Sequence, residues 1–311
     1  MKKLSKIMLI AFIAILSTSC SDDDTTETPV DNTITGLASR NANLSILVQA
    51  LGKAGLASTL QGSGPYTVFA PTNDAFNTFL DANGFDSLDD VPEATLKQVL
   101  LNHVVSGKVL STQLTTGYIK TLATFGTTTN NIDMYVNTST AEGTKLFNGV
   151  ANVVTPNVEA SNGVVHVVDA IIGIPTIATH ATANPNFSTL ASLLTAQGLV
   201  PTLAGTASSP FTVFAPLNSA FDSATLDLYT GLNSDGKSAV LKYHVVTGAN
   251  VVSSGIPTTP INTFQGQAVT IAGTVITDAE GRNTNIVLTD VQCGNGIIHA
   301  IDKVLLPNLA D

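Results

Sequence analysis

The chain has 311 residues, of which 44% are hydrophobic and only 12% are charged, and its formal net charge is -10 at pH 7. Disordered chains have few apolar residues and many charges, so this composition excludes that class. The 13 lysines and arginines form no long basic block, so nucleic acid is not an expected partner and the chain has no charge-based affinity for anionic lipid headgroups. At about 100 to 200 residues per domain, the length predicts two domains.

The first residues have the pattern of an export signal. Residues 1–19 begin with lysines and continue into an unbroken apolar run of ten residues over 7–16, which is typical of a signal peptide and too short to span a bilayer. The run ends at small residues followed by Cys20, in the order Leu16-Ser17-Thr18-Ser19-Cys20. This ending resembles a bacterial lipobox, in which the cysteine becomes the lipidated N-terminus. Leu16 lies four residues before Cys20 rather than three, as in the looser signals of some Gram-negative lineages; the alternative is ordinary secretion with an incidental cysteine.

Residues 20–32 form a predicted flexible, acidic tether. Three adjacent aspartates at 22–24 are followed by threonine, glutamate and proline. Because a flexible tail cannot fix ligand geometry, a solvated acidic run is favoured over a metal site, and no metal or other cofactor is expected. An acidic stretch behind a lipidated cysteine also resembles the tag that exports lipoproteins of some lineages. The expected location is therefore the outer membrane, with the protein facing either the cell surface or the periplasm.

The rest of the chain contains one unit twice, over residues 33–174 and 175–311. Four blocks match in order, at offsets of 143, 145, 141 and 133 residues. Because the offset changes between blocks, insertions and deletions are expected in the intervening loops. The matched blocks begin at Thr33 and Thr176, Thr67 and Thr212, His103 and His244, and Asn162 and Asn295.

Each copy starts with helical patterns and ends with strand patterns. In the first copy, apolar residues at i, i+3, i+4 and i+7 predict a helix over 44–51, and residues 66–70 predict a buried strand. Asn73 and Asn218 are expected to cap the helix that follows this strand in each copy. Residues 118–172 and 261–306 lack helical periodicity and predict short strands joined by turns. Helices followed by strands predict an α+β domain.

These blocks resemble the fasciclin-type (FAS1) domain. The residues that carry the resemblance are Thr-Val-Phe-Ala-Pro-x-Asn-x-Ala-Phe (67–76 and 212–221), Tyr243-His244, and the closing segments 162–169 and 295–302, which end in Asp169 and Asp302. The resemblance covers nearly all of residues 33–307 and implies two tandem domains, each a β-sheet wedge with a layer of short helices. It also implies roles in cell adhesion, matrix contact and surface attachment.

Four of the five histidines occupy paired positions in the two copies: His103, His166, His244 and His299. A histidine near Asp169 or Asp302 could act as a general base. The favoured interpretation is a neutral imidazole that is buried among valines and isoleucines and satisfied by backbone hydrogen bonds. Because both copies keep the same pair, we expect these rings to be architectural and largely buried. His180 has Leu37 at its counterpart and is not part of the shared plan.

No catalytic motif is present in the sequence. It has no Gly-x-Ser-x-Gly, no His-Glu-x-x-His and no phosphate-binding Gly-Lys-Ser/Thr. Cys293 has no possible disulfide partner once Cys20 is lipidated, and it is expected to be a small buried apolar residue rather than an exposed thiol. No catalytic residue is therefore assigned, and a non-enzymatic role is expected.

The resemblance points to two surface regions that carry adhesion in some animal relatives. One is the Tyr-His region, represented here by Tyr243 and His244, although a tyrosine at the start of an apolar strand is more often a core residue, which is the favoured interpretation of Tyr243. The other is an acidic position before the closing block, represented by Glu159 in the first copy and Asp290 in the second. Neither copy has the Asp-Ile pair of those relatives, so integrin-type recognition is not expected.

Three functions remain open from the sequence. The leading hypothesis is a lipid-anchored adhesion or interaction protein that binds polysaccharide or surface protein, with two copies raising avidity. The second is a carbohydrate-binding accessory of a surface nutrient-uptake system, which needs a concave site with exposed aromatics. The third is a hydrolase that uses a carboxylate pair such as Glu159 with Asp169. The oligomeric state and the ligand are left open.

Overall fold

The computed structural model describes residues 30–139 and 145–309 of the chain. The predicted signal peptide, Cys20 and the tether up to residue 29 lie outside the described residues. From Asp31 onward the chain forms one compact unit. Asp31 and Asn32, which the sequence places at the end of the tether, are hydrogen-bonded to the first copy: Asn32 accepts from the Ser161 backbone at 2.8 Å and from the Arg40 guanidinium at 3.1 Å.

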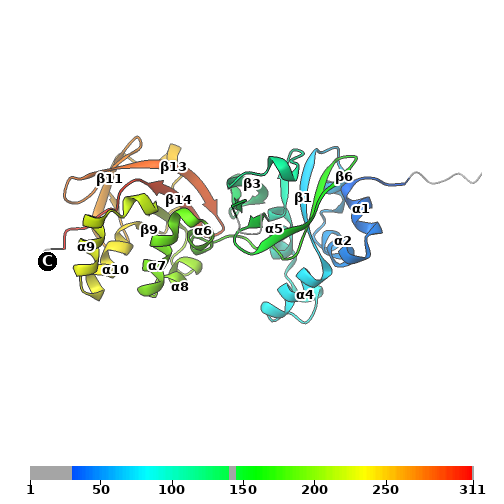
Figure 1. Ribbon diagram of the computed structural model, residues 1–311, viewed down its shortest axis with the longest axis horizontal. Helices are drawn as coiled ribbons and strands as arrows, with labels where there is room; N and C mark the ends of the chain where they lie inside the picture. Colours follow the sequence, from blue (N-terminus) through cyan, green and yellow to red (C-terminus); the bar gives the residue numbers. More distant parts are fainter. Residues whose placement is uncertain (1–29, 140–144, 310–311) are drawn as a thin grey trace, which may run out of the picture. The chain divides into compact units, whose positions relative to one another are not determined.

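The first copy has helices before strands, as predicted, apart from one early strand (Figure 1). Its helices are α1 (Ile34–Arg40), α2 (Ser45–Lys53), α3 (Ala57–Gln61), α4 (Asn73–Ala82) and α5 (Glu93–Asn102). Its strands are β1 (Tyr66–Pro71), β2 (Val104–Ser106), β3 (Gly117–Thr124), β4 (Asn131–Asn137), β5 (Leu146–Phe147), β6 (Ala151–Ala160) and β7 (Gly163–Val168).

The second copy repeats this order of elements. Its helices are α6 (Ile177–Ala183), α7 (Ser188–Ala196), α8 (Val200–Ala204), α9 (Ser223–Gly231) and α10 (Ser234–Tyr243). Its strands are β8 (Phe211–Pro216), β9 (Val245–Thr247), β10 (Ile261–Asn262), β11 (Ala268–Ala272), β12 (Val275–Thr277), β13 (Asn283–Cys293) and β14 (Gly296–Ile301). Short 3-10 turns complete both copies, at 42–44, 88–90, 111–113, 185–187, 218–220 and 253–255.

Each copy is built on one seven-stranded sheet. The order is β2-β1-β7-β6-β5-β4-β3 in the first and β10-β11-β12-β13-β14-β8-β9 in the second. The early strand pairs in parallel with the last one, so that Phe69 lies opposite His166 and Phe214 lies opposite His299. The other pairings are antiparallel. The predicted α+β class is confirmed.

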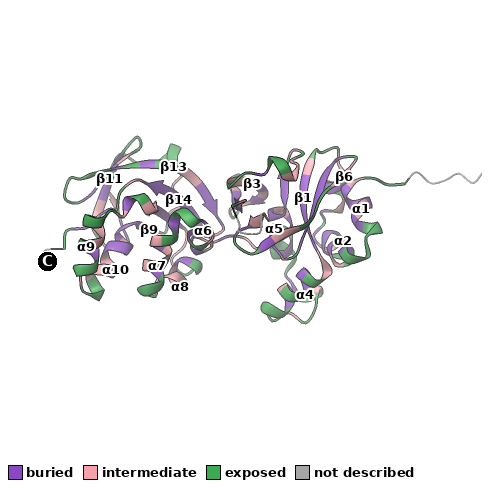
Figure 2. Ribbon diagram, in the orientation of Figure 1, coloured by how far each residue is buried: buried purple, intermediate pink, exposed green. Residues whose placement is uncertain are grey.

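The central strands are buried on both faces, which explains their continuous apolar sequences. Val68, Ala70 and Val165 point into the core that the helices α1 to α5 cover. Phe69 and Val168 point the other way, into a second cluster with strand residues such as Met134. Figure 2 shows β1 and β14 largely buried, whereas the outer faces of α9 and α10 are exposed. One helical layer and one folded-over sheet therefore enclose two small cores in each copy.

The structure corrects the expected role of Asn73 and Asn218. Thr72 is the last extended residue before α4, and its hydroxyl accepts the capping bond from the Ala75 backbone at 3.2 Å. Asn73 is already helical, so its side chain reaches back to α2 and accepts from the Ile46 backbone at 3.0 Å. In the second copy Asn218 binds the start of α7 in the same way, and α9 is capped by Asp222. Neither asparagine caps the helix that follows its strand; each instead binds a first-turn N–H of an earlier helix, α2 or α7.

The two copies share a buried polar contact in which β4 meets β13. The Asp133 carboxylate accepts a hydrogen bond from the Gln292 backbone at 2.8 Å and pairs with Lys120 at 3.0 Å. The His180 Nε2 atom lies 3.0 Å from the Asp133 carbonyl oxygen. Burial raises the pKa of Asp133, and the Gln292 N–H and Lys120 oppose this shift. The contact therefore joins the copies through directed hydrogen bonds.

Candidate functional site

The paired histidines of β7 and β14 are fully engaged with backbone groups. The Nε2 atom of His166 lies 2.9 Å from the Val109 carbonyl oxygen, and its Nδ1 atom accepts from the Asn157 backbone at 3.2 Å. His299 has the same arrangement with Val251 at 2.9 Å and Asp290 at 3.3 Å. These partners define the Nε2–H tautomer. Neither ring has a free lone pair for a substrate proton.

The other pair consists of His103 and His244, which directly follow the last residues of the helices α5 and α10. In both rings Nδ1 lies 2.8 Å from the carbonyl oxygen four residues earlier, and Nε2 accepts a backbone N–H at 2.9 Å. Burial lowers the pKa of each ring to about 4, although the backbone bond partly opposes this. All four motif histidines are at most 2% exposed, so their predicted burial is confirmed.

The aspartates that occupy paired positions in the two copies bind asparagines rather than histidines. Asp169 accepts from the backbone of Asn152 at 2.7 Å and from its side chain at 3.2 Å. Asp302 holds Asn285 in the same way, at 2.8 and 2.7 Å. These clamps join neighbouring strands, and the histidine nitrogens use backbone partners instead. Among the described residues, no group of three or more histidine, cysteine or acidic side chains could hold a metal ion.

The Tyr-His region is not available to a partner. Tyr243 is fully buried; its hydroxyl donates to the Ala268 carbonyl at 2.9 Å and accepts from the Ala279 backbone at 2.9 Å. With His244 also buried, this region is core rather than a contact surface. Cys293 is buried as predicted, and burial raises the pKa of its thiol well above the usual value.

The two acidic candidates have different surroundings. The Glu159 side chain is 70% exposed and pairs with Lys108 at 3.4 Å. Asp290 has a left-handed backbone (φ 62°), as does Asn157 (φ 58°) at the matching position. Its carboxylate accepts from the Ser253 backbone at 2.7 Å and also binds the Ser253 hydroxyl. Asp290 therefore closes a loop, and Glu159 is the acidic candidate that faces solvent.

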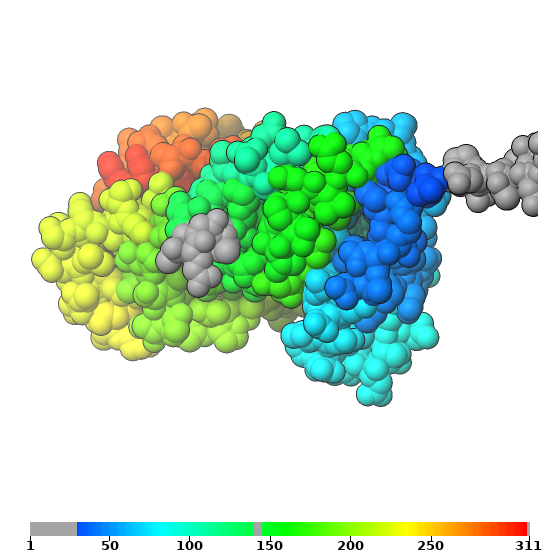
Figure 3. Space-filling model, turned by 45° about the vertical axis from the view of Figure 1, so that its right-hand side comes forward, coloured from blue at the N-terminus to red at the C-terminus, as the bar shows by residue number. Residues whose placement is uncertain are grey.

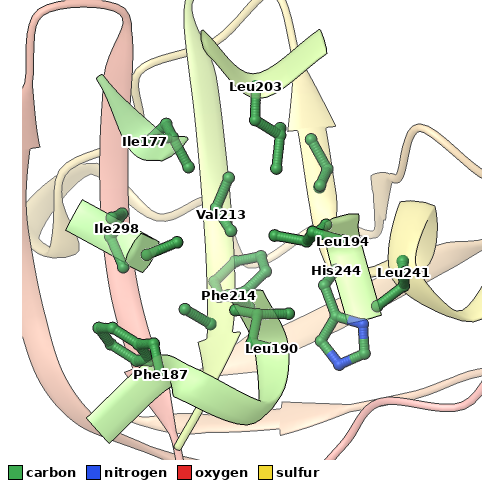
Figure 4. Close-up of a pocket in the computed structure, with 13 residues that line it drawn as sticks. Ile177, Phe187, Leu190, Leu194, Leu203, Val213, Phe214, Leu241, His244 and Ile298 are labelled. Atoms are coloured by element: carbon green, nitrogen blue, oxygen red, sulfur yellow. The ribbon is translucent and has the colours of Figure 1, made fainter. Parts of the chain in front are cut away.

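An apolar cavity lies between the helices and sheet of the second copy, and Figure 4 shows the side chains around it. Leu190, Leu194, Val213 and Phe214 converge on it, with His244 at its margin. Its volume is only about 10 Å³. That space is smaller than any organic ligand, so the cavity is an imperfection of core packing.

A wider groove lies on the surface of the second copy, with a volume of about 620 Å³. One wall is the turn between α9 and α10 with the first turns of α10; the other is the hairpin after β10 with the segment at 308–309. Figure 3 shows the α9–α10 region (yellow) beside the C-terminal segment (red). Asn233, Asp235, Gln265 and Gln267 contribute its polar lining. We name this feature the α10 groove.

A second hollow of about 280 Å³ continues the α10 groove and shares Asp235, Ala239 and Gln265 with it. Phe264 lines this end, and the residue is 38% exposed. The Lys242 ammonium lies 5.6 Å from the centre of the Phe264 ring. The groove thus places an accessible aromatic ring at one end and a series of polar side chains along its length.

The α10 groove was not expected from the sequence, because the candidate sites were drawn from segments that match between the two copies. The groove lies where they diverge: residues 83–92 join α4 to α5, whereas only Leu232 and Asn233 join α9 to α10. In the first copy the long connection is held by Lys53, which donates to the carbonyls of Leu88 and Asp89 at 2.7 Å. The break in the repeat near residue 222 is the sequence signal that could have located the groove.

Comparison with known proteins identifies the two copies. The model of the Fasciclin domain matches residues 42–175 and 185–307. Human periostin is 28% identical over 262 residues, which cover 82% of this chain and 30% of periostin. Protein sll1483 of Synechocystis sp. is 39% identical over 142 residues, which cover 45% of this chain and 72% of that protein.

A solved structure has the same tandem architecture. It is a FAS1 domain pair from the insect cell adhesion molecule Fasciclin I, which matches with a TM-score of 0.52 and 21% identity. The match covers 85% of this chain and 97% of that one, and at this identity it establishes the fold alone. Two family matches on one chain, each covering one seven-stranded sheet and most of its helices, show that the chain belongs to the fasciclin domain family, with two FAS1 domains in tandem.

Proposed function

We propose that this protein is a lipid-anchored, extracytoplasmic adhesion or interaction protein that binds surface or matrix components through its two FAS1 domains. One observation supports this most directly: the motif histidines are hydrogen-bonded to backbone groups, and the motif aspartates are hydrogen-bonded to asparagines. The most repeated residues therefore maintain a scaffold, and recognition falls to the surface. The description of Fasciclin I as an insect cell adhesion molecule is consistent with this proposal.

The membrane partner is proposed from Cys20, which would carry the lipid. Acyl chains contribute about 0.8 kcal/mol per buried methylene, so two or more chains hold a protein on a membrane. No helix in the described part of the chain is both long and apolar enough to cross a bilayer. The proposed location is the outer membrane, and protease treatment of intact cells distinguishes the surface from the periplasmic side.

The anchor is tested by replacing Cys20. In a bacterial host that processes lipoproteins, we expect the full chain to partition into detergent and the Cys20→Ser variant to remain in the aqueous phase. Cys293→Ser is the matched control, because this buried thiol is not a lipidation site and its variant should still partition into detergent. Equal partitioning of the Cys20→Ser variant and the unaltered chain would contradict the lipid anchor.

The interaction role is tested by retention of the chain from residue 25 on arrays of polysaccharides, matrix proteins and whole cells. Broad retention that falls steeply as the immobilised partner is diluted supports avidity from two domains. Retention by one glycan alone supports the second candidate, an accessory of a nutrient-uptake system, which the α10 groove and its exposed Phe264 favour. Absence of retention on every surface would contradict both.

Glu159 is the exposed acidic candidate for partner contact, and its loss should weaken retention. The Glu159→Gln variant keeps the shape of the side chain and removes the charge that pairs with Lys108. Glu280→Gln is the control, since Glu280 is also exposed but lies on the β12–β13 turn of the second domain. Equal retention of both variants and the unaltered chain would exclude Glu159 from the contact. Glu159 and Asp169 bind separate partners, which gives the hydrolase hypothesis no support.

A further inference from the structure

We infer that the α10 groove of the second domain binds an uncharged saccharide. This inference rests on the proposed interaction role and names the chemical class of one partner. The groove and its extension measure about 620 and 280 Å³, which is a size suited to a small ligand or a short stretch of a polymer. The groove is open to solvent along its length, so a chain longer than the groove can lie across it.

The side chains along the groove supply hydrogen-bonding groups of both kinds. Asp235 is exposed and Ser238 is half-buried, and within the described residues neither side chain has a hydrogen bond or ion pair. Gln265 accepts from the Gln267 backbone at 3.0 Å, which fixes its carbonyl and leaves its amide N–H groups directed elsewhere. A carboxylate, a hydroxyl and an amide together match the alternating donors and acceptors of sugar hydroxyls.

Phe264 supplies the apolar contact that a sugar ring needs. Its backbone N–H is bound to the Val245 carbonyl at 2.6 Å, which holds the residue against β9. Phe264 is 38% exposed at the end of a polar groove, and its aromatic ring offers a flat face for the C–H groups of a sugar. The Lys242 ammonium lies over the same ring at 5.6 Å, where it can also donate to a ligand hydroxyl.

The charge of the groove favours a neutral ligand. Asp235 and Lys242 contribute one charge of each sign, and no cluster of cations lines either hollow. The whole chain carries a net charge of -10, so polyanions such as nucleic acid, phosphate polymers or acidic glycans are repelled. A neutral polyhydroxyl ligand is the class that satisfies the polar groups without an unpaired charge.

The binding experiment uses the chain from residue 25, titrated with neutral glucan, mannan, xylan and galactan oligosaccharides, with alginate oligosaccharides as the anionic comparison. We expect at least one neutral series to bind and the alginate series not to bind. Phe264→Ala removes the ring, and Gly231→Phe fills the groove, because a Cβ at Gly231 meets no heavy atom within 4 Å. Each should weaken binding by about tenfold or more.

Leu228→Ala is the control, since Leu228 is 45% exposed on α9 and does not line the groove. It should bind as the unaltered chain does, and circular dichroism should show all three variants folded. The inference is overturned if no neutral series binds, if alginate binds as well as the neutral series, or if Gly231→Phe and Phe264→Ala both bind normally. If Gly231→Phe and Phe264→Ala keep their surface retention, the groove is not the contact surface and the proposed function still stands. If oligosaccharides bind but the chain is retained on no surface, the proposed function fails and saccharide binding by the groove still stands.

Discussion

Buried histidines determine how the stability of this protein depends on pH. His103, His180 and His244 are buried neutral, and burial lowers the pKa of each from 6.5 to about 4. Below pH 6.5 the unfolded chain binds protons that the folded chain does not. The contribution of these histidines to the free energy of unfolding is therefore fully present above pH 6.5 and is lost as the pH falls towards 4. Asp133, with its raised pKa, acts in the opposite direction.

We expect the free energy of unfolding to fall by about 1 kcal/mol per pH unit for each of these histidines between pH 6.5 and 4. Urea unfolding at half-unit pH intervals measures this slope. His180→Gln removes one titrating group and can still donate to the Asp133 carbonyl, so the slope should fall by about 1 kcal/mol per pH unit. An unchanged slope in that variant would show that His180 titrates normally in the folded protein.

At the scale of elements, one asparagine ties the helices of each domain to its sheet. Asn162 and Asn295 precede β7 and β14. Asn295 accepts from the Ile177 backbone at 2.9 Å and donates to the Leu203 and Gly205 carbonyls at 2.8 and 3.0 Å. Asn162 makes the same three bonds in the first domain, at 2.9, 2.7 and 2.8 Å.

Replacing either asparagine should therefore destabilise its domain strongly. Asn295→Ala leaves three backbone groups without partners, two of them in buried hydrogen bonds, and should cost about 3 kcal/mol. Chemical denaturation measures the loss, and Asn162→Ala should give a similar value in the first domain. Asn186→Ala, at an exposed residue beside α7, should change stability by less than about 0.5 kcal/mol. A loss of less than about 0.5 kcal/mol in Asn295→Ala would contradict the role of Asn295 in joining the helices to the sheet.

The elements were predictable where local pattern decides, and the contacts between them were not. The helix at 44–51 and the early strand at 66–70 follow from apolar spacing, and the burial of His299 follows from its Ile and Ala neighbours. From the sequence, Asn162 was only the first residue of a block that matches between the copies, and its role could not be predicted because its partners lie about 100 residues away. Gly163 is needed there for space: a Cβ would lie 2.0 Å from the Tyr66 carbonyl oxygen. The α10 groove is formed by a two-residue turn and a hairpin that is distant in the sequence. No local sequence pattern predicts that these two segments lie together.

At the scale of the whole molecule, the Asp133 contact couples the two domains. We expect the unaltered chain to unfold in one calorimetric transition, and Asp133→Ala to broaden or split it, because the Gln292 N–H then loses its buried acceptor. Limited proteolysis should leave residues 173–183 intact in the unaltered chain and cut them first in the variant. Lys120→Ala is the control, because the Lys120 side chain is 60% exposed and its loss keeps the Gln292 bond. A single sharp transition in Asp133→Ala would contradict the coupling.

The parallel pairing of the early strand with the last one governs the order in which each domain is completed. Tyr66 lies opposite Gly163 and Phe211 lies opposite Gly296, so each sheet joins strands separated by most of the domain. Such long-range pairing makes folding slow relative to helical proteins. As the chain emerges residue by residue, β1 has no partner for its parallel edge until β7 follows. The first domain can be finished before α6 is available, so the tandem can mature one domain at a time, with only one open sheet exposed to aggregation.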